Sequence, residues 1–86
     1  MPTAAQHDRR YERLKRLLRE MREEADLTQR ALGDLLDQPQ SWVHNSETGN
    51  RRVDLAEFCR WCQACGVDPV EAVIRYLGRR RSSSTR

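Results

Sequence analysis

The sequence predicts an all-α domain built from five short helices. Its 86 residues allow one small domain and leave little room for the larger architectures of most enzymes. Charged residues make up 34% of the chain and aromatic residues 6%, a composition that suits amphipathic helices better than a sheet. Apolar residues also recur at three- and four-residue intervals, which is the spacing of one helix face. We therefore expect an all-helical protein that is not an enzyme.

The first two helices are predicted from this spacing and from one capping residue. Residues 1–10 are polar, contain Pro2 and show no apolar period, so we expect a flexible N-terminal arm. A first helix then carries, along one stripe, Tyr11, Leu14, Leu17, Leu18, Met21 and Ala25. Thr28 is a good N-cap for a second helix of about two or three turns, whose apolar positions are Ala31, Leu32, Leu35 and Leu36.

Three further helices follow, and each has a recognisable start. Pro39 fits the first turn of a third helix, which we expect to run from Pro39 or Gln40 to about Glu47. Asp54 is the predicted N-cap of a fourth, which Gly66 ends and whose inward residues are Leu55, Phe58, Trp61, Cys62 and Cys65. Asp68 and Pro69 open a fifth, which carries Val70, Val73, Ile74 and Leu77. The domain is therefore predicted over residues 11–77, with a basic disordered tail over residues 78–86.

The positive charge of the chain is modest in total but clustered. The net charge is +3, and the basic residues fall into three groups: Arg9, Arg10, Arg13, Lys15 and Arg16; Arg51 and Arg52; and Arg75, Arg79, Arg80, Arg81 and Arg86. Clustered positive charge favours an anionic partner. No stretch approaches the roughly 18 apolar residues of a membrane span, and the N-terminus lacks the apolar run of a secretory signal. We expect a cytoplasmic protein without a membrane partner.

The second and third predicted helices are short and joined by a tight turn, which makes them a helix-turn-helix candidate. Residues 27–49, LTQRALGDLLDQPQSWVHNSETG, closely resemble the signature of the lambda-repressor-like family, also called Xre/Cro. The likeness combines Thr28 and Gln29 at the start of the second helix with an apolar position inside the third and a Glu-x-Gly ending. It continues through residues 51–54 and 66–69. The resemblance implies a five-helix, lambda-repressor-like fold that binds double-stranded DNA.

The resemblance also implies which residues touch the bases of DNA. The third helix would lie in the major groove, with base contacts from Gln40, Ser41 and Asn45, and with His44 beside them on the outward face. Glutamine and asparagine amides suit adenine, whose N6 and N7 offer a donor and an acceptor. We therefore expect at least one contact that reads an adenine.

Two further sets of residues take their roles from the same resemblance. Contacts to DNA phosphates are implied for Gln29, Asn50, Arg51 and Arg52. An ion pair is implied between Arg22 on the first helix and Glu47 at the end of the third. The planar fork of an arginine matches a carboxylate, so this pair is expected to steady the third helix from behind.

Three positions differ from the usual pattern of the family. Asp37 stands in the turn where glycine is usual, because one residue there tends to be left-handed. Gly33 stands where a small alanine is common, which allows a close approach at some cost in helix propensity. Ser46 occupies a position that is usually apolar and inward.

The cysteines and the histidine in the third helix invite other interpretations. Cys59, Cys62 and Cys65 are spaced by three residues along one helix, so they drift around its face, and no fourth metal ligand is nearby. Reduced core thiols are favoured. His44 has no neighbour at metal-ligand spacing other than Glu47, and a contact with DNA or solvent is favoured. We expect no catalytic residue, no metal and no cofactor.

The functional interpretation is a sequence-specific transcriptional regulator that acts as a homodimeric repressor of a palindromic operator. One alternative is the antitoxin of a toxin–antitoxin pair that also regulates itself through DNA, with a toxin as its partner. A less favoured one is a regulator that senses redox state or metal through its cysteines. The fifth helix has more apolar residues than one terminal helix needs to seal a small core, so the predicted dimer interface is Val70, Val73, Ile74, Tyr76 and Leu77.

Overall fold

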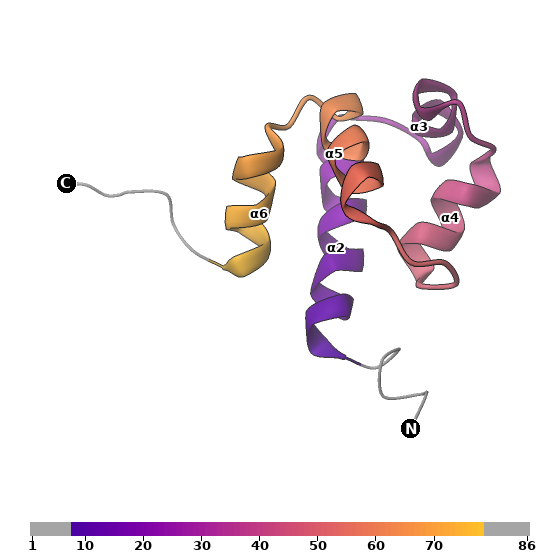
Figure 1. Ribbon diagram of the computed structural model, residues 1–86. Helices are drawn as coiled ribbons and strands as arrows, with labels where there is room; N and C mark the ends of the chain where they lie inside the picture. Colours follow the sequence, from indigo (N-terminus) through magenta and orange to yellow (C-terminus); the bar gives the residue numbers. More distant parts are fainter. Residues whose placement is uncertain (1–7, 79–86) are drawn as a thin grey trace.

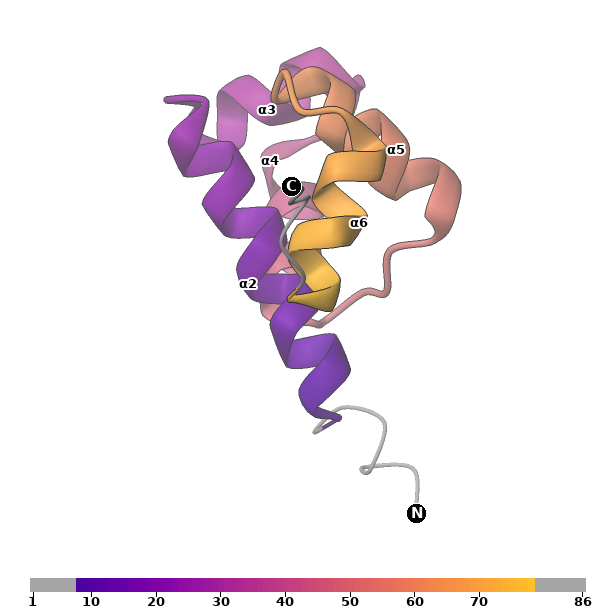
Figure 2. The same cartoon turned by 90° about the vertical axis from the view of Figure 1, so that its left-hand side faces the viewer.

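The computed structural model describes residues 8–78, which form five α-helices and no strand. The helices are α2 (Arg9–Glu24), α3 (Gln29–Leu36), α4 (Gln40–Thr48), α5 (Leu55–Ala64) and α6 (Pro69–Leu77). In Figure 1, α2 and α5 lie in the middle of the molecule, α3 and α4 lie together on one side and α6 lies on the other. Figure 2 shows that α6 lies beside α2 and α5. The predicted all-α, five-helix architecture is confirmed for the described residues.

Four of the five helices in residues 8–78 begin at a side chain that accepts a hydrogen bond from an exposed backbone N–H group, and α4 begins after Pro39 without one. Thr28 caps α3 by accepting from the Ala31 amide, and Asp54 caps α5 in a capping box with Glu57, as their positions in the sequence predict. Asp8 caps α2, so this helix begins at Arg9 and includes two residues that the sequence assigned to the arm. Residues 1–7 of the expected arm, and all of the expected tail except Gly78, lie outside the described residues.

The core lies where α2, α3, α4 and α5 meet. Its fully buried large side chains are Leu18, Met21, Leu32, Val43, Trp61 and Cys62, with Ser46 among them. The Trp61 indole N–H donates to the backbone carbonyl of Leu18 at 3.1 Å, which satisfies the one polar atom of a buried tryptophan. α6 contributes Ala72 to the core and covers α2 and α5.

The turn between α3 and α4 accommodates two of the unusual residues together. Asp37 ends α3 in the left-handed conformation with φ of 58°, so an aspartate takes the place that glycine usually fills. Gly33 lies directly against this turn, because a Cβ atom at Gly33 would lie 2.6 Å from the carbonyl oxygen of Gln38. The Gln38 amide in turn donates to the Gly33 carbonyl at 2.8 Å. The missing side chain therefore permits the close approach of turn and helix.

Two leucines that the helical spacing placed inward are exposed. Leu55 is 72% exposed and Leu35 is 59% exposed. Leu55 is the first residue of α5, where the chain has only just entered the helix and no neighbouring element covers it. Leu35 lies on α3, a helix of eight residues whose inward stripe is made of Leu32, Gly33 and Leu36. No helix within residues 8–78 is long and apolar enough to cross a membrane.

Candidate nucleic-acid interface

α3 and α4 form a helix-turn-helix whose second helix presents a polar outer row. The two helices are joined by residues 37–39 and pack against each other (Figure 1). On α4, Val43 and Ser46 are buried against the core. Gln40, Ser41 and His44 are exposed and Asn45 is half-buried. Residues four apart share a helix face, so these four side chains make one outward row of hydrogen-bonding groups.

The ion pair expected between Arg22 and Glu47 is present and holds α4 to α2. Arg22 Nε donates to Glu47 Oε2 at 2.6 Å, and Arg22 Nη2 donates to Glu47 Oε1 at 3.2 Å. The Arg22 side chain is 12% exposed and that of Glu47 is 4% exposed, so the pair is nearly removed from water. Arg22 Nη1 also donates to the Leu27 carbonyl at 2.8 Å. This second bond ties the same guanidinium to the segment between α2 and α3.

A chain of amide hydrogen bonds connects this ion pair to the outer row. Gln29, the first residue of α3, donates from Nε2 to Glu47 Oε1 at 3.1 Å. Gln40 Nε2 then donates to Gln29 Oε1 at 3.4 Å. A residue expected at a phosphate and one expected at a base are thus joined before any DNA is present. Gln29 keeps a second amide proton, and it lies at the positive end of α3.

The loop after α4 presents Asn50 and Arg52 but turns Arg51 inward. Asn50 and Arg52 are exposed, and the Arg52 guanidinium lies 4.2 Å from the centre of the Tyr11 ring. The Arg51 guanidinium instead bonds to Ser46 and Glu57 within the protein. The resemblance to the family implied phosphate contacts for both arginines. In the structure Arg52 is exposed, whereas the Arg51 side chain is 29% exposed and paired with Glu57.

Part of the positive charge on α2 is paired locally. Lys15 Nζ lies 2.8 Å from Glu12 Oε2, and Arg19 Nε lies 2.9 Å from Glu23 Oε2. At the start of the helix, Arg10 pairs with Asp8 at 3.1 Å. These pairs lower the local field, so clustering in the sequence overstates the positive potential of this helix.

The three cysteines lie along α5 and its end without forming a disulfide. Cys62 is buried, whereas Cys59 and Cys65 are half-buried. Burial raises the pKa of the Cys62 and Cys65 thiols to about 11, so both are protonated at neutral pH. The Cys62 sulfur lies 4.0 Å from the Met21 sulfur, as expected for packing in an apolar core. These two thiols act as small core side chains.

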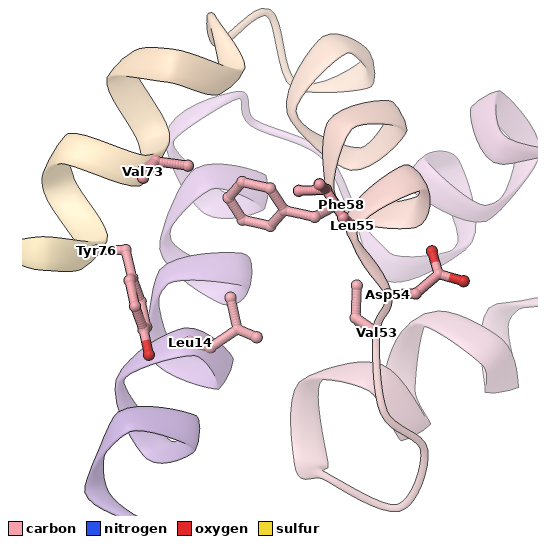
Figure 3. Close-up of a pocket in the computed structure, with 7 residues that line it drawn as sticks. All are labelled: Leu14, Val53, Asp54, Leu55, Phe58, Val73 and Tyr76. Atoms are coloured by element: carbon pink, nitrogen blue, oxygen red, sulfur yellow. The ribbon is translucent and has the colours of Figure 1, made fainter.

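An apolar groove lies between α2, α5 and α6. It has a volume of about 330 Å³, and Figure 3 shows its lining residues: Leu14, Val53, Asp54, Leu55, Phe58, Val73 and Tyr76. Of the residues expected at a dimer interface, Val70 is 62% exposed, Val73 is 39% exposed and Leu77 is 48% exposed. Ile74 and Tyr76 are half-buried. The groove and the exposed side chains of α6 share Val73, so they form one continuous apolar surface.

A braced helix with an outward hydrogen-bonding row, set in a five-helix domain, defines a helix-turn-helix protein. Residues 13–73 match the family model described as a helix-turn-helix domain. The structure is similar to that of an XRE-family like protein from Pseudomonas syringae pv. tomato str. DC3000, with a TM-score of 0.79 and 36% sequence identity. That similarity covers 90% of this chain and 94% of the other. A search of the curated proteins found no match.

The chain belongs to the XRE family of helix-turn-helix DNA-binding proteins. The lambda-repressor-like resemblance in residues 27–49 is therefore confirmed.

Proposed function

We propose that this protein is a cytoplasmic, sequence-specific transcriptional regulator that binds a palindromic operator as a homodimer and represses transcription. The main support is the outward row of hydrogen-bonding side chains on α4. Gln40, Ser41 and His44 are exposed on a helix that Glu47 anchors from behind, so their donors and acceptors face a partner. Because the helix is already fixed, its side chains can meet the base edges of a major groove without the entropy loss of first ordering the helix.

In the proposed complex the two kinds of contact come from different parts of the helix-turn-helix. Gln40, Ser41, His44 and Asn45 read base edges, and the amides of Gln40 and Asn45 favour adenine. Phosphates are held by Gln29 at the start of α3 and by Asn50 and Arg52 in the loop after α4. The exposure of Asn50 and Arg52 supports this assignment.

The test begins with an operator selected from random duplex DNA. Gln40→Ala or Asn45→Ala should cost about 1 to 3 kcal/mol on that operator and much less on random duplexes, because each removes a base contact. Gln63→Ala is the matched control, since Gln63 is an exposed glutamine on α5 away from the helix-turn-helix. An equal loss on both DNAs would count against base reading by α4.

Phosphate binding by Arg52 has a separate signature. Arg52→Gln should weaken binding to all sequences and reduce the slope of log affinity against log salt by about 0.9, the value for one phosphate contact. An unchanged slope would remove Arg52 from the DNA backbone.

The proposed homodimer forms through the apolar surface of α6 and the adjoining groove. The chain segments outside the described residues offer little to cover this surface, because apart from Met1 they contain only small or polar side chains and one proline. A second copy supplies the same groove and the same exposed Val70 and Leu77, so a twofold pair can bury both at once. The pair would carry two copies of α4, suited to half-sites roughly 34 Å apart.

Sedimentation at several protein concentrations tests the dimer. Val73→Glu should give a folded monomer with far weaker operator binding, since a charge would be buried in the interface. Leu35→Glu is the matched control, because Leu35 is an exposed leucine on α3, away from the groove. If Val73→Glu still dimerises, or if the unmodified protein is monomeric both free and on its operator, this interface is wrong.

A further inference from the structure

Arg51 connects α4 to the start of α5 through two N–H groups of its guanidinium and through a contact with an aromatic ring. Arg51 Nη1 donates to Ser46 Oγ on α4 at 3.2 Å, and Arg51 Nη2 donates to Glu57 Oε2 on α5 at 2.9 Å. The central carbon of the guanidinium, Arg51 Cζ, lies over the ring of Trp42, also on α4, at 4.4 Å from the ring centre. One side chain therefore spans two helices with two hydrogen bonds and one cation–π contact.

Both ends of this connection are themselves fixed. Ser46 is fully buried, and its hydroxyl donates to the Trp42 carbonyl at 2.8 Å while it accepts from Arg51. Glu57 belongs to the capping box of α5, because its Oε1 accepts from the Asp54 amide at 3.0 Å. The hydrogen bond from Arg51 lowers the pKa of the Glu57 carboxyl. Arg51 thus joins a buried hydroxyl on one helix to the N-terminal cap of the next.

The backbone of Arg51 is held at the same place. Its amide donates to the Asn45 carbonyl at 3.2 Å, and its carbonyl accepts from the Tyr11 hydroxyl at 3.3 Å. Trp42 continues the contact into the core, where its ring centre lies 6.1 Å from that of Trp61. Two of the five guanidinium N–H groups are committed in this way and the Arg51 side chain is only 29% exposed, so few of its donors are placed to clamp a phosphate in the usual two-pronged manner.

We propose that Arg51 is a positioning residue, which sets the orientation of α4 against α5 through Ser46, Trp42 and Glu57 and influences DNA recognition without contacting DNA. The proposal rests on the proposed sequence-specific binding by α4. It assigns different roles to two adjacent arginines: Arg52 holds a phosphate, and Arg51 holds the helix that reads the bases. It also gives Ser46 a use, since an apolar residue there could not accept from Arg51.

The conservative substitution to lysine separates the two roles. A lysine can hold a phosphate as a point charge, but it cannot reproduce the two-armed bond to Ser46 and Glu57 together with the position over Trp42. We expect Arg51→Lys and Arg51→Gln to lower the ratio of operator affinity to random-DNA affinity by similar factors, about fivefold or more, with an unchanged salt slope. For Arg52, the lysine variant should retain the salt slope that the glutamine variant loses.

Two results would overturn the proposal. If Arg51→Lys restores binding and Arg51→Gln reduces the salt slope by about 0.9, Arg51 is a phosphate contact. If the Arg51 variants lower the melting temperature but leave the ratio of affinities unchanged at a temperature where they are folded, Arg51 supports stability alone.

Ser46→Ala provides a second variant that cannot act through DNA contact, because Ser46 is fully buried. It should lower the same affinity ratio, and its effect should not add to that of Arg51→Lys, since both break the same connection. Additive effects would contradict a shared role.

A measurement made without DNA tests the positioning role of Arg51 separately from sequence-specific DNA binding. The near-ultraviolet circular dichroism of the two tryptophans should change in Arg51→Lys and Ser46→Ala but not in Arg52→Gln. If selection yields no preferred operator while this spectral pattern holds, sequence-specific binding fails and the connection between α4 and α5 stands. If the Arg51 variants leave the spectrum unchanged, the positioning role fails by itself.

Discussion

Removing the negative charge of Glu47 should destabilise the domain far more than removing a similar charge from its surface. Glu47 accepts hydrogen bonds from Arg22 and Gln29, and its side chain is 4% exposed. Glu47→Ala leaves the buried Arg22 guanidinium without a counter-charge, so we expect a loss of about 3 to 5 kcal/mol in the free energy of unfolding. Glu47→Gln keeps one carbonyl acceptor, and its cost should be lower, about 2 kcal/mol.

The matched control is Glu23→Gln, which breaks an arginine–glutamate pair of the same chemistry in solvent. Arg19 is 66% exposed and Glu23 is 52% exposed, so water and salt already screen that pair. The expected cost is therefore far smaller than that of Glu47→Gln. Urea unfolding followed by tryptophan fluorescence measures all three variants. If Glu47→Gln and Glu23→Gln cost the same, burial does not make the Arg22–Glu47 pair important.

Three further predictions concern packing, thiols and pH. Gly33→Ala should destabilise by about 1 to 3 kcal/mol in urea unfolding, because a Cβ there meets the Gln38 carbonyl oxygen at 2.6 Å; a gain in stability would contradict this packing. At pH 7.5, Cys62 and Cys65 should react with iodoacetamide much more slowly in the folded protein than in urea, since their pKa is raised to about 11; equal rates would contradict their burial. The folded protein lowers the pKa of Glu57 below its ordinary value of 4.5. The stability that Glu57 contributes is therefore present at pH values above 4.5 and is lost as the pH falls through the lower folded pKa. Glu57→Gln should flatten the acid limb of a curve of unfolding free energy against pH.

The helices and their starts could be predicted because their signals are local. Thr28 and Asp54 cap α3 and α5 by accepting from amides three residues ahead, a contact that the sequence contains in full. The left-handed residue of the turn came from the resemblance to the family, in which glycine is usual there, and Asp37 takes that conformation with φ of 58°. The pair of Arg22 and Glu47 is 25 residues apart, and only the resemblance to a known family brought its members together.

The role of Arg51 could not be predicted from its neighbours in the sequence. Its partners Ser46 and Glu57 lie on two different helices, and the angle between those helices decides whether one guanidinium reaches both. The same limit applies to Leu55, whose place in the helical pattern is inward. Leu55 is the first residue of α5 and lines the groove, and periodicity does not say which elements cover that end of the helix.

The contacts around α4 imply that this helix is held in one orientation before it meets DNA. Glu47 ties it to α2, the amide of Gln40 ties it to α3, and the bond from Arg51 to Ser46 ties it toward α5. Each connection uses a polar side chain with a defined geometry, whereas apolar packing alone would allow α4 to slide or rotate slightly. A helix fixed on three sides loses little further entropy on binding, and it also adapts poorly to a wrong base. Ser46 buries less apolar surface than an apolar residue would at this position. That loss is offset by the hydrogen bond from Arg51, which an apolar side chain could not accept.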